Sequence, residues 1–104
     1  MAKKEVCYMG DSFKSLESFP QEVYEKFTQD LEFLSYGLAP LSRIKPMNGL
    51  GKNVSELIKN GKPAYRVVYV IKDDVIYVLH VFTKTSNGTD KKHETAIKLR
   101  FKAI

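Results

Sequence analysis

The chain has 104 residues, of which 43% are hydrophobic and 28% are charged, and its formal net charge is +5. This balance excludes a disordered chain and is typical of one globular domain, here 1–104, that buries its own core. No apolar run approaches the ~20 residues of a membrane span, and no signal peptide or pair of cysteines is evident, so we expect a cytoplasmic protein without membrane association.

The charge is divided unevenly along the chain. Residues 1–40 carry four Lys/Arg against seven Asp/Glu, a net charge of −3. Residues 41–104 carry thirteen against five, a net charge of +8. A basic segment of this density attracts a polyanion such as nucleic acid. The alternative is a lysine-rich surface that only keeps the protein in solution, and charge alone does not decide between them.

The N-terminal residues predict a strand followed by a short helix. KEVCYM at 4–9 alternates between apolar and polar residues as strands do. Asp11 or Ser12 is placed to cap a helix that runs to about Phe19.

A second helix is predicted from Pro20, which suits a first helical turn, to Tyr36. Gly37 ends it as a C-terminal cap. We expect the acidic residues of both helices to point away from the core. The core face of the second helix is a stripe at helical spacing, formed by Val23, Phe27, Leu31 and Leu34.

The middle of the chain predicts a turn-rich stretch and then three strands. The stretch SRIKPMNGLGKN at 42–53 has three basic residues among glycines. Asn60-Gly61 favours a tight hairpin turn, and Asp73-Asp74 marks a second one. The predicted strands are rich in Val, Ile and Tyr and span Val54–Lys59, Ala64–Lys72 and Val75–Lys84.

A last helix is predicted from a cap at Thr89 or Asp90 to about residue 103. Its buried stripe is formed by His93, Ala96, Ile97, Arg100, Phe101 and Ile104. The element order β-α-α-β-β-β-α predicts an α+β fold. In this fold two N-terminal helices pack on an antiparallel sheet with a mixed edge, and a C-terminal helix follows.

Three polar residues stand out because they lie in apolar strands. Arg66 lies in AYRVVYV, and His80 and Lys84 lie in YVLHVFTK. Together on one face, they could bind a phosphodiester, stabilise developing charge on phosphorus and transfer protons. The structural alternative is that Arg66 pairs with Glu56 across strands, since an unpaired buried arginine is costly, and that His80 is satisfied in the core.

Whether these three residues share a face depends on the hairpin loop at Asp73-Asp74. A two-residue loop pairs Arg66 with Val81 and leaves the other two on the opposite face. A three-residue loop pairs Arg66 with Phe82 and brings all three together. The sequence leaves both registers open.

Basic residues also begin the last helix. Lys91, Lys92 and His93 lie in its first turn, where cations oppose the helix dipole. This arrangement hints at a clamp for phosphate that also uses the exposed backbone N–H groups. The competing interpretation makes His93 the top of the apolar stripe.

Several familiar chemistries are absent from the sequence. GLGK at 49–52 lacks the spacing of a nucleotide-binding phosphate loop, and one cysteine with two separated histidines does not make a zinc site. We therefore expect no metal and no cofactor. A catalyst of this composition works mainly with cations, which suits RNA cleavage, where the 2′-hydroxyl of the substrate is the nucleophile.

Several motifs resemble the phage-derived, HigB-like subgroup of the RelE/ParE toxin superfamily. They are KPMNGLG at 45–51, the strand with Glu-Leu-Ile, and AYRVVYVIKDDVIYVLHVFTKTS at 64–86. The segment MGDSFKSLESFPQEV at 9–23 is similar to the N-terminus common in that subgroup. The resemblance spans nearly the whole chain, and YRVVYV and VLHVFTK are its most specific parts.

The resemblance implies a sheet whose concave side faces mRNA in the ribosomal A site, and a helix-turn-helix, HigA-like antitoxin. It implies that Arg66 contacts the scissile phosphate and that Lys84 contributes to catalysis or binding, with His80 as a third candidate. The predicted RNA-binding residues are Lys45 and Lys52 in the basic loop region, together with Lys91, Lys92 and His93.

The sequence also departs from the pattern of that subgroup. Thr85 replaces a usual lysine, Asp90 or Lys91 falls where proline is expected, and no tyrosine follows residue 77. These departures concern RNA cleavage more than the fold.

The first hypothesis is therefore a ribosome-dependent endoribonuclease toxin of a type II toxin–antitoxin module. The alternatives are a ParE-like toxin that acts on DNA gyrase without nuclease chemistry, and a degenerate member that only binds its antitoxin. A homodimer stays open.

Overall fold

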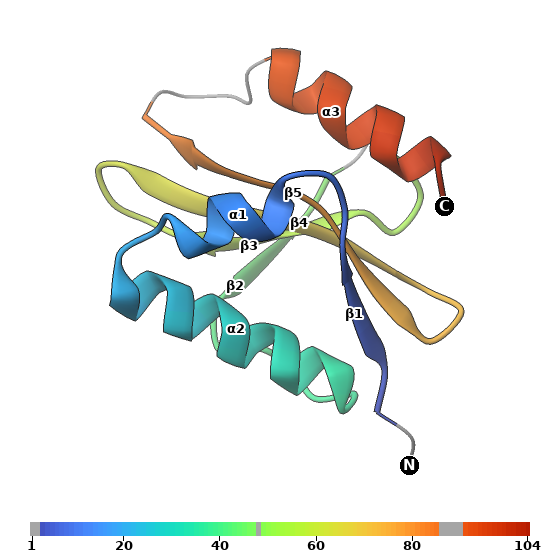
Figure 1. The fold of residues 1–104 in the computed structure, drawn as a ribbon, viewed down its shortest axis with the longest axis horizontal. Helices are drawn as coiled ribbons and strands as arrows, with labels where there is room; N and C mark the ends of the chain where they lie inside the picture. Colours follow the sequence, from blue (N-terminus) through green and yellow to red (C-terminus); the bar gives the residue numbers. More distant parts are fainter. Residues whose placement is uncertain (1–2, 48, 86–90) are drawn as a thin grey trace.

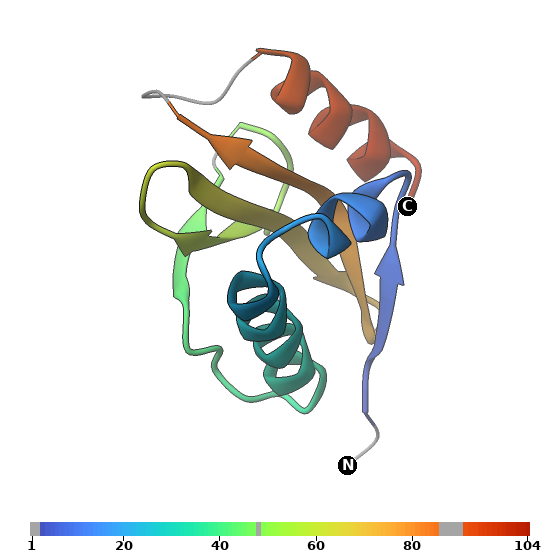
Figure 2. The ribbon, with the colours of Figure 1, turned by 60° about the vertical axis from the view of Figure 1, so that its left-hand side comes forward.

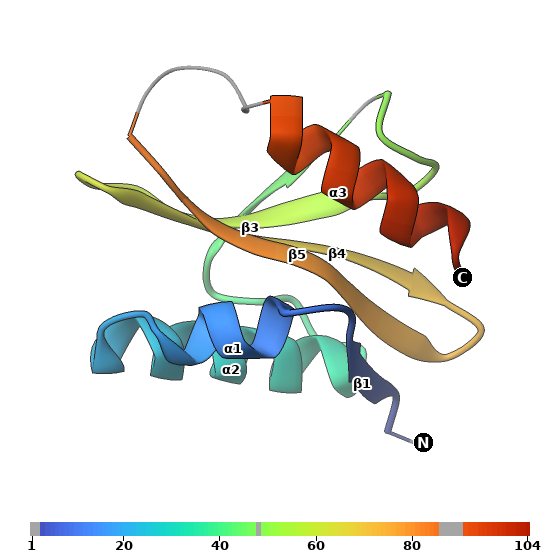
Figure 3. The same ribbon diagram turned by 45° about the horizontal axis from the view of Figure 1, so that its top comes forward.

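The computed structural model describes residues 3–47, 49–85 and 91–104. They form an α+β fold of three layers, in which α1 and α2 cover one face of a sheet and α3 covers the other (Figures 1 and 3). The predicted fold class is confirmed. In chain order the elements are β1 Glu5–Tyr8, α1 Ser12–Glu17, α2 Gln21–Ser35, β2 Arg43–Pro46, β3 Ser55–Lys59, β4 Ala64–Lys72, β5 Val75–Lys84 and α3 Lys91–Lys102.

The strands form one five-stranded sheet in the order β1-β5-β4-β3-β2. The strand β1 pairs with β5 in parallel, and the other neighbours are antiparallel, so the predicted mixed edge is confirmed. Figure 2 shows β1 and β2 at opposite edges of the sheet. Among the described residues, none of the helices combines the length and apolarity that crossing a bilayer requires.

The strand β2 corrects the sequence prediction, which gave 42–53 only turns. Its four residues are all exposed, and Arg43 and Lys45 alternate with Ile44 and Pro46. A short, charged edge strand has no apolar pattern of its own. It forms here because β3 offers backbone partners, which is tertiary context that a local pattern does not contain.

The stripe predicted for α2 forms the core beneath the sheet. Val23, Phe27, Leu31 and Leu34 are all buried there, together with Leu57, Val67 and Val81 from the strands. Gly37 follows the helix at φ 77°, and its N–H donates to the carbonyl of Leu34 at 3.0 Å. The predicted C-terminal cap is therefore confirmed.

Asp30 contradicts the expectation that the acidic residues of the helices point outward. It is fully buried, and its Oδ1 accepts hydrogen bonds from the N–H groups of Leu41 and Ser42, at 2.8 and 3.3 Å. A buried carboxylate that accepts backbone N–H groups stabilises an otherwise unpaired turn. Asp30 thus fixes the segment that leads from α2 into β2.

The two hairpins differ from each other, and the first also differs from its prediction. Residues 60–63 join β3 to β4, a longer connection than the tight Asn60-Gly61 turn. The turn between β4 and β5 consists of Asp73 and Asp74 alone, at φ 52° and 62°, as a two-residue hairpin of this twist requires.

The register of β4 on β5 combines the two predicted alternatives. The loop has two residues, yet Arg66 pairs with Phe82, as expected for the longer loop. A β-bulge accounts for this, because Val68 pairs with His80 while Tyr69 pairs with Val78, which leaves Leu79 as an extra residue.

A second core lies between the sheet and α3. Ile97 is fully buried against strand residues that include Val68, Leu79 and Phe82, and Phe101 and Ile104 pack beside it. The predicted stripe of the last helix therefore faces the sheet. Its predicted caps, Thr89 and Asp90, lie outside the described residues.

Candidate nucleic-acid interface

Cationic side chains gather on the sheet face that carries α3. Residues directly opposite each other in an antiparallel sheet point to the same side. Val68 and Phe82 pack under α3, so the residues paired with them share that face. One row across the sheet is formed by Arg43, Ile58, Arg66 and Phe82, and the next by Lys45, Glu56, Val68 and His80.

Lys84 lies two residues beyond Phe82 and points to the same side. The structure therefore brings Arg66, His80 and Lys84 to one face of the sheet. The bulge at Leu79 makes this possible, because without the extra residue the two-residue turn would place them on opposite faces. We call Arg43, Lys45, Glu56, Arg66 and Lys84 the cationic face.

Arg66 and Glu56 form the buried centre of the cationic face. They are 8% and 4% exposed, and Nε of Arg66 lies 3.7 Å from Oε1 of Glu56. This is an ion pair without a hydrogen bond, and neither Nε of Arg66 nor Oε2 of Glu56 has a hydrogen-bond partner among the described residues. The predicted alternative of a cross-strand pair is confirmed, but it leaves both groups incompletely satisfied.

Burial raises the pKa of Glu56 above its ordinary value. Arg66, Lys84 and Lys45 act in the opposite direction, because each places a positive charge near the carboxylate. One carboxylate therefore lies among three cations, and the cations outnumber it.

His80 is occupied on both ring nitrogens. Nη1 of Arg100 lies 3.2 Å from its Nδ1, and its Nε2 lies 2.7 Å from Nδ1 of His93. Because a guanidinium only donates, Nδ1 of His80 accepts, and the proton on Nε2 is donated to His93. Burial, His93 and Arg100 together lower the pKa of His80 to about 4. The predicted alternative of a satisfied histidine therefore matches the geometry.

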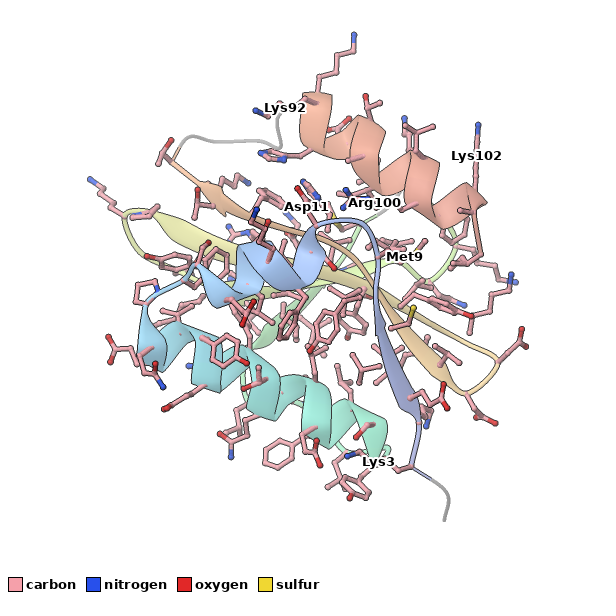
Figure 4. All side chains as sticks on the ribbon, in the orientation of Figure 1. Lys3, Met9, Asp11, Lys92, Arg100 and Lys102 are labelled. Atoms are coloured by element: carbon pink, nitrogen blue, oxygen red, sulfur yellow. The ribbon has the colours of Figure 1, made fainter. Side chains whose placement is uncertain are left out.

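Arg100 joins three elements. Nη1 of Arg100 lies close to His80 and also donates a hydrogen bond, at 2.8 Å, to the carbonyl of Leu79. Leu79 is the bulge residue of β5. Nη2 of Arg100 donates to Oδ1 of Asp11 at 3.1 Å, and this bond lowers the pKa of Asp11 (Figure 4). The side chain predicted to cap α1 therefore binds Arg100, while Ser12 donates to the carbonyl of Val78.

The first turn of α3 adjoins the cationic face through a stack of rings. The ring of His93 lies over that of Phe82 at 4.3 Å and 21°, and His80 stacks on Phe82 at 5.4 Å. Lys91 and Lys92 are exposed in this turn. Lys92 and His93 also line a cleft of about 660 Å³ between α1 and α3, which includes Asp11.

Lys52 is the predicted RNA-binding residue that the structure places elsewhere. It lines a separate cleft of about 290 Å³ with Lys72, Phe101 and Ile104. That cleft lies at the C-terminal end of α3, whereas Lys92 lies at the other end, as the positions of Lys92 and Lys102 in Figure 4 show. Lys45, by contrast, lies on the cationic face.

The two histidines that are separated in the sequence touch in the fold. Within the described parts of the chain, however, no group of three or more His, Cys, Asp or Glu side chains could hold a metal ion. The contact between His80 and His93 links β5 to α3.

Sequence reasoning missed Arg43 and Arg100 and treated Glu56 only as a partner for Arg66. Arg43 was overlooked with the strand that positions it. Arg100 was assigned to the apolar stripe by its spacing. For Glu56 a signal existed, since an acidic residue in the strand SELIK is as unusual as Arg66 in its own strand.

Comparison with known proteins identifies the fold and the family. A chain in the crystal structure of the toxin–antitoxin complex RelBE2 from Mycobacterium tuberculosis superposes with a TM-score of 0.51 and 20% sequence identity, over 79% of this chain and 99% of that chain. The shared fold confirms the RelE-like architecture. No curated protein matches the sequence. The family model of Gp49-like phage-derived proteins (DUF891) matches residues 14–102, so the chain belongs to the Gp49-like family of phage-derived proteins.

Proposed function

We propose that this protein is the toxin of a type II toxin–antitoxin module and that it cleaves mRNA on the ribosome. The observation that carries the proposal is the cationic face, where Arg66, Lys45 and Lys84 surround one buried carboxylate. Membership of a phage-derived family and a fold shared with a chain of a toxin–antitoxin complex support the toxin assignment.

Each cation has a separate role in this proposal. Arg66 binds the scissile phosphate, because a guanidinium presents several donors to phosphate oxygens. Lys84 stabilises the leaving oxygen. Arg43, Lys45, Lys91 and Lys92 hold the RNA backbone on either side.

The histidines act through α3. Because both nitrogens of His80 are engaged, it positions α3 and does not shuttle protons. His93 stacks on Phe82 and places the first turn of α3, with its two lysines, next to the cationic face. A fixed arrangement of donors stabilises the charge that develops on phosphorus without reorganising during the reaction.

The proposal includes a helix-turn-helix, HigA-like antitoxin as the partner that silences the toxin. The chemistry of the cationic face suits a partner that offers carboxylates to it, because such a partner would compete with the phosphates of mRNA.

Arg66→Ala tests the assignment. Wild-type expression is expected to arrest growth and to cut translated messages, and Arg66→Ala is expected to reduce cleavage by about 10²-fold or more, as the loss of a charge-stabilising donor does. Growth curves and mapping of mRNA 5′ ends after induction measure both effects. Arg66→Lys retains the charge, and circular dichroism verifies that both variants fold.

Lys52→Ala is the matched control, because it removes a cation outside the cationic face. It is expected to remain as toxic as the wild type. Equal toxicity of wild type and Arg66→Ala would refute the role of Arg66. DNA breaks with intact messages would instead indicate a toxin that acts on gyrase.

A further inference from the structure

Exposed apolar side chains gather where α2 leads into the edge strand β2. Of the seven large hydrophobic residues that are exposed in the described parts of the chain, four lie within residues 36–44. Figure 2 shows this segment running from the end of α2 to the outer edge of the sheet. We call the four residues the apolar border; they are Tyr36, Leu38, Leu41 and Ile44. Apolar side chains that gather in this way mark a surface that another molecule covers.

The outer side of β2 offers backbone groups to an added strand. Met47 donates from its N–H to the carbonyl of Val54 at 2.9 Å, one step beyond the last pair of β2 and β3. Hydrogen-bonded and non-bonded pairs alternate along an antiparallel ladder, so Lys45 bonds to β3 and Ile44 does not. The N–H and C=O groups of Ile44 therefore point away from β3, toward the edge of the sheet.

The two sides of β2 differ in character. Ile44 pairs with Leu57, which lies in the core under α2, so its side chain points to the helix side. Arg43 and Lys45 point to the cationic face. Paired residues of neighbouring strands point to the same side, so an added strand would alternate with β2. One of its sides would lie along the apolar border, and the other would lie beside two cations.

We propose that β2 and the apolar border form a docking site for an extended segment of a partner protein, in which acidic and apolar residues alternate. The segment adds to the sheet as a further strand, and its backbone bonds to that of Ile44. Its apolar side chains cover the apolar border, and its carboxylates pair with Arg43 and Lys45. In this mode of recognition the backbone bonds supply affinity and the alternate side chains supply specificity. This docking site goes beyond the proposed function, because it exists whether or not the protein cleaves RNA.

Charge favours this partner over a second copy of the chain. Two copies of β2 side by side would bring Arg43 and Lys45 of both copies together, and like charges that face each other across strands destabilise the pair. Pro46 has no N–H, which shortens the ladder that a second β2 could form. Charges and prolines of this kind protect edge strands from self-association. The same cations attract a strand that carries carboxylates.

Nucleic acid matches only one side of β2. Its phosphates would bind Arg43 and Lys45 from the cationic face and would leave Ile44, on the opposite side of the strand, uncovered. A segment of alternating residues satisfies both sides at once. Because Lys45 also belongs to the cationic face, a docked segment competes with a polyanion for this lysine.

The test measures binding of the full chain to a synthetic peptide in which glutamate alternates with valine, by fluorescence anisotropy. Leu41→Gln is expected to weaken binding by about tenfold or more, because it removes an apolar contact of the border. Leu99→Gln is the matched control and is expected to bind like wild type. Leu99 is 63% exposed on α3, and Leu41 is 67% exposed, so neither change is expected to disturb the core.

Variants of the peptide test the pattern and the charge. A peptide of the same composition, with its glutamates and valines in separate blocks, is expected to bind at least about tenfold more weakly. Arg43→Gln is expected to weaken binding of the alternating peptide. It is expected to leave unchanged the binding of a peptide that has glutamine in place of glutamate, because the lost interaction is between charges.

Amide hydrogen exchange measures the addition of a strand directly. Saturating peptide is expected to slow the exchange of the N–H of Ile44, which points to the edge, and to change that of Lys45 little, because it already bonds to β3. N-methylation of alternate peptide residues is expected to prevent binding in one phase and to leave it intact in the other.

The remaining outcomes overturn the inference. Equal affinity of wild type and Leu41→Gln would exclude the apolar border, and unchanged exchange at Ile44 would exclude an added strand. Dimerisation of wild type that Leu41→Gln abolishes would make a second copy the occupant.

The same variant separates the docking site from the proposed function. Leu41→Gln is expected to cut mRNA as wild type does, because Leu41 lies outside the cationic face. If wild type binds the peptide as described and does not cut mRNA, the proposed function fails and the docking site stands. If wild type cuts mRNA and does not bind the peptide, the docking site fails and the proposed function stands.

Discussion

At the scale of single residues, His80 shows how a fold assigns a role to a side chain. Its imidazole lies on the same sheet face as Arg66 and Lys84, where a catalytic histidine would be expected. Its neighbours decide otherwise, because Arg100 and His93 occupy both nitrogens and burial holds the ring neutral. Arg66 and Glu56, by contrast, keep buried side-chain atoms without a hydrogen-bond partner among the described residues.

The lowered pKa of His80 predicts how the stability of the fold depends on pH. The folded-state pKa of about 4 lies below the ordinary value of 6.5. Between these values the unfolded chain binds a proton that the folded chain does not. The contribution of His80 to stability is therefore complete above pH 6.5 and decreases as the pH falls toward 4.

This loss amounts to at most about 1.4 kcal/mol per pH unit, the value for one proton, and to less because the ring is partly exposed. Urea unfolding at several pH values measures it. His80→Gln, which does not titrate, is expected to flatten the curve in this range, with wild type as the reference. Identical curves for the two proteins would show that His80 is not held neutral.

At the scale of elements, α3 is fixed to the sheet at both ends. Near its start His93 stacks on Phe82, and near its end Phe101 packs against the loop before β3. Gly51 makes this second contact possible. A Cβ on Gly51, at φ 147°, would lie 2.9 Å from the ring of Phe101 and 2.9 Å from Cγ2 of Val54.

Gly51→Ala is therefore expected to destabilise the protein by about 1–3 kcal/mol more than Gly49→Ala does. Gly49 is the matched control, because it also has a positive φ of 89° but a Cβ there would meet nothing within 4 Å. Thermal unfolding of both variants measures the difference. In a Phe101→Ala background the excess cost of Gly51→Ala is expected to decrease, with the contact to Cγ2 of Val54 left in place, and an unchanged excess would show that the Phe101 ring is not the source of the clash.

Most elements could be predicted from local patterns, and the exceptions share a cause. The stripe of α2 and the Asp73-Asp74 turn follow from spacing and turn chemistry. The burial of Asp30 could not be predicted, because its carboxylate accepts a hydrogen bond from a backbone N–H group of a later loop. The strand β2 could not be predicted either, because it forms through its pairing with β3.

The candidate site was predictable in its residues and not in its geometry. Arg66 and Lys84 stand out in the sequence as charges in apolar strands. Their shared face depends on Leu79, which lies in an unbroken apolar run and gives no local sign of a bulge. Glu56 acquires significance only when β3 places it beside Arg66.

At the scale of the whole molecule, charge is divided between the two faces of the sheet. The helices α1 and α2 carry most of the acidic residues of the N-terminal part, and they cover one face. The cationic face and the basic first turn of α3 lie on the other. A polyanion that binds the second face releases counterions, so its affinity depends on salt.

Single substitutions are expected to change this salt dependence according to position. Under the proposed function Lys45→Gln and Lys92→Gln would each remove one phosphate contact, and each is expected to reduce the slope of log K against log salt by about 0.7 for single-stranded RNA. Fluorescence anisotropy with a 2′-deoxy-substituted, uncleavable RNA measures the slope. Lys102→Gln, at the opposite end of α3, is the control with an unchanged slope.

The segregation of charge between the two faces has a consequence for the moments before contact. In the field of a polyanion, a molecule with one acidic and one basic face experiences a torque as well as an attraction. It turns once it comes within about a Debye length, since charges are largely screened beyond that distance, and encounters that begin with the helices forward are disfavoured. Under the proposed function, Arg66 therefore approaches its phosphate already oriented, and the acidic helices α1 and α2 set that orientation.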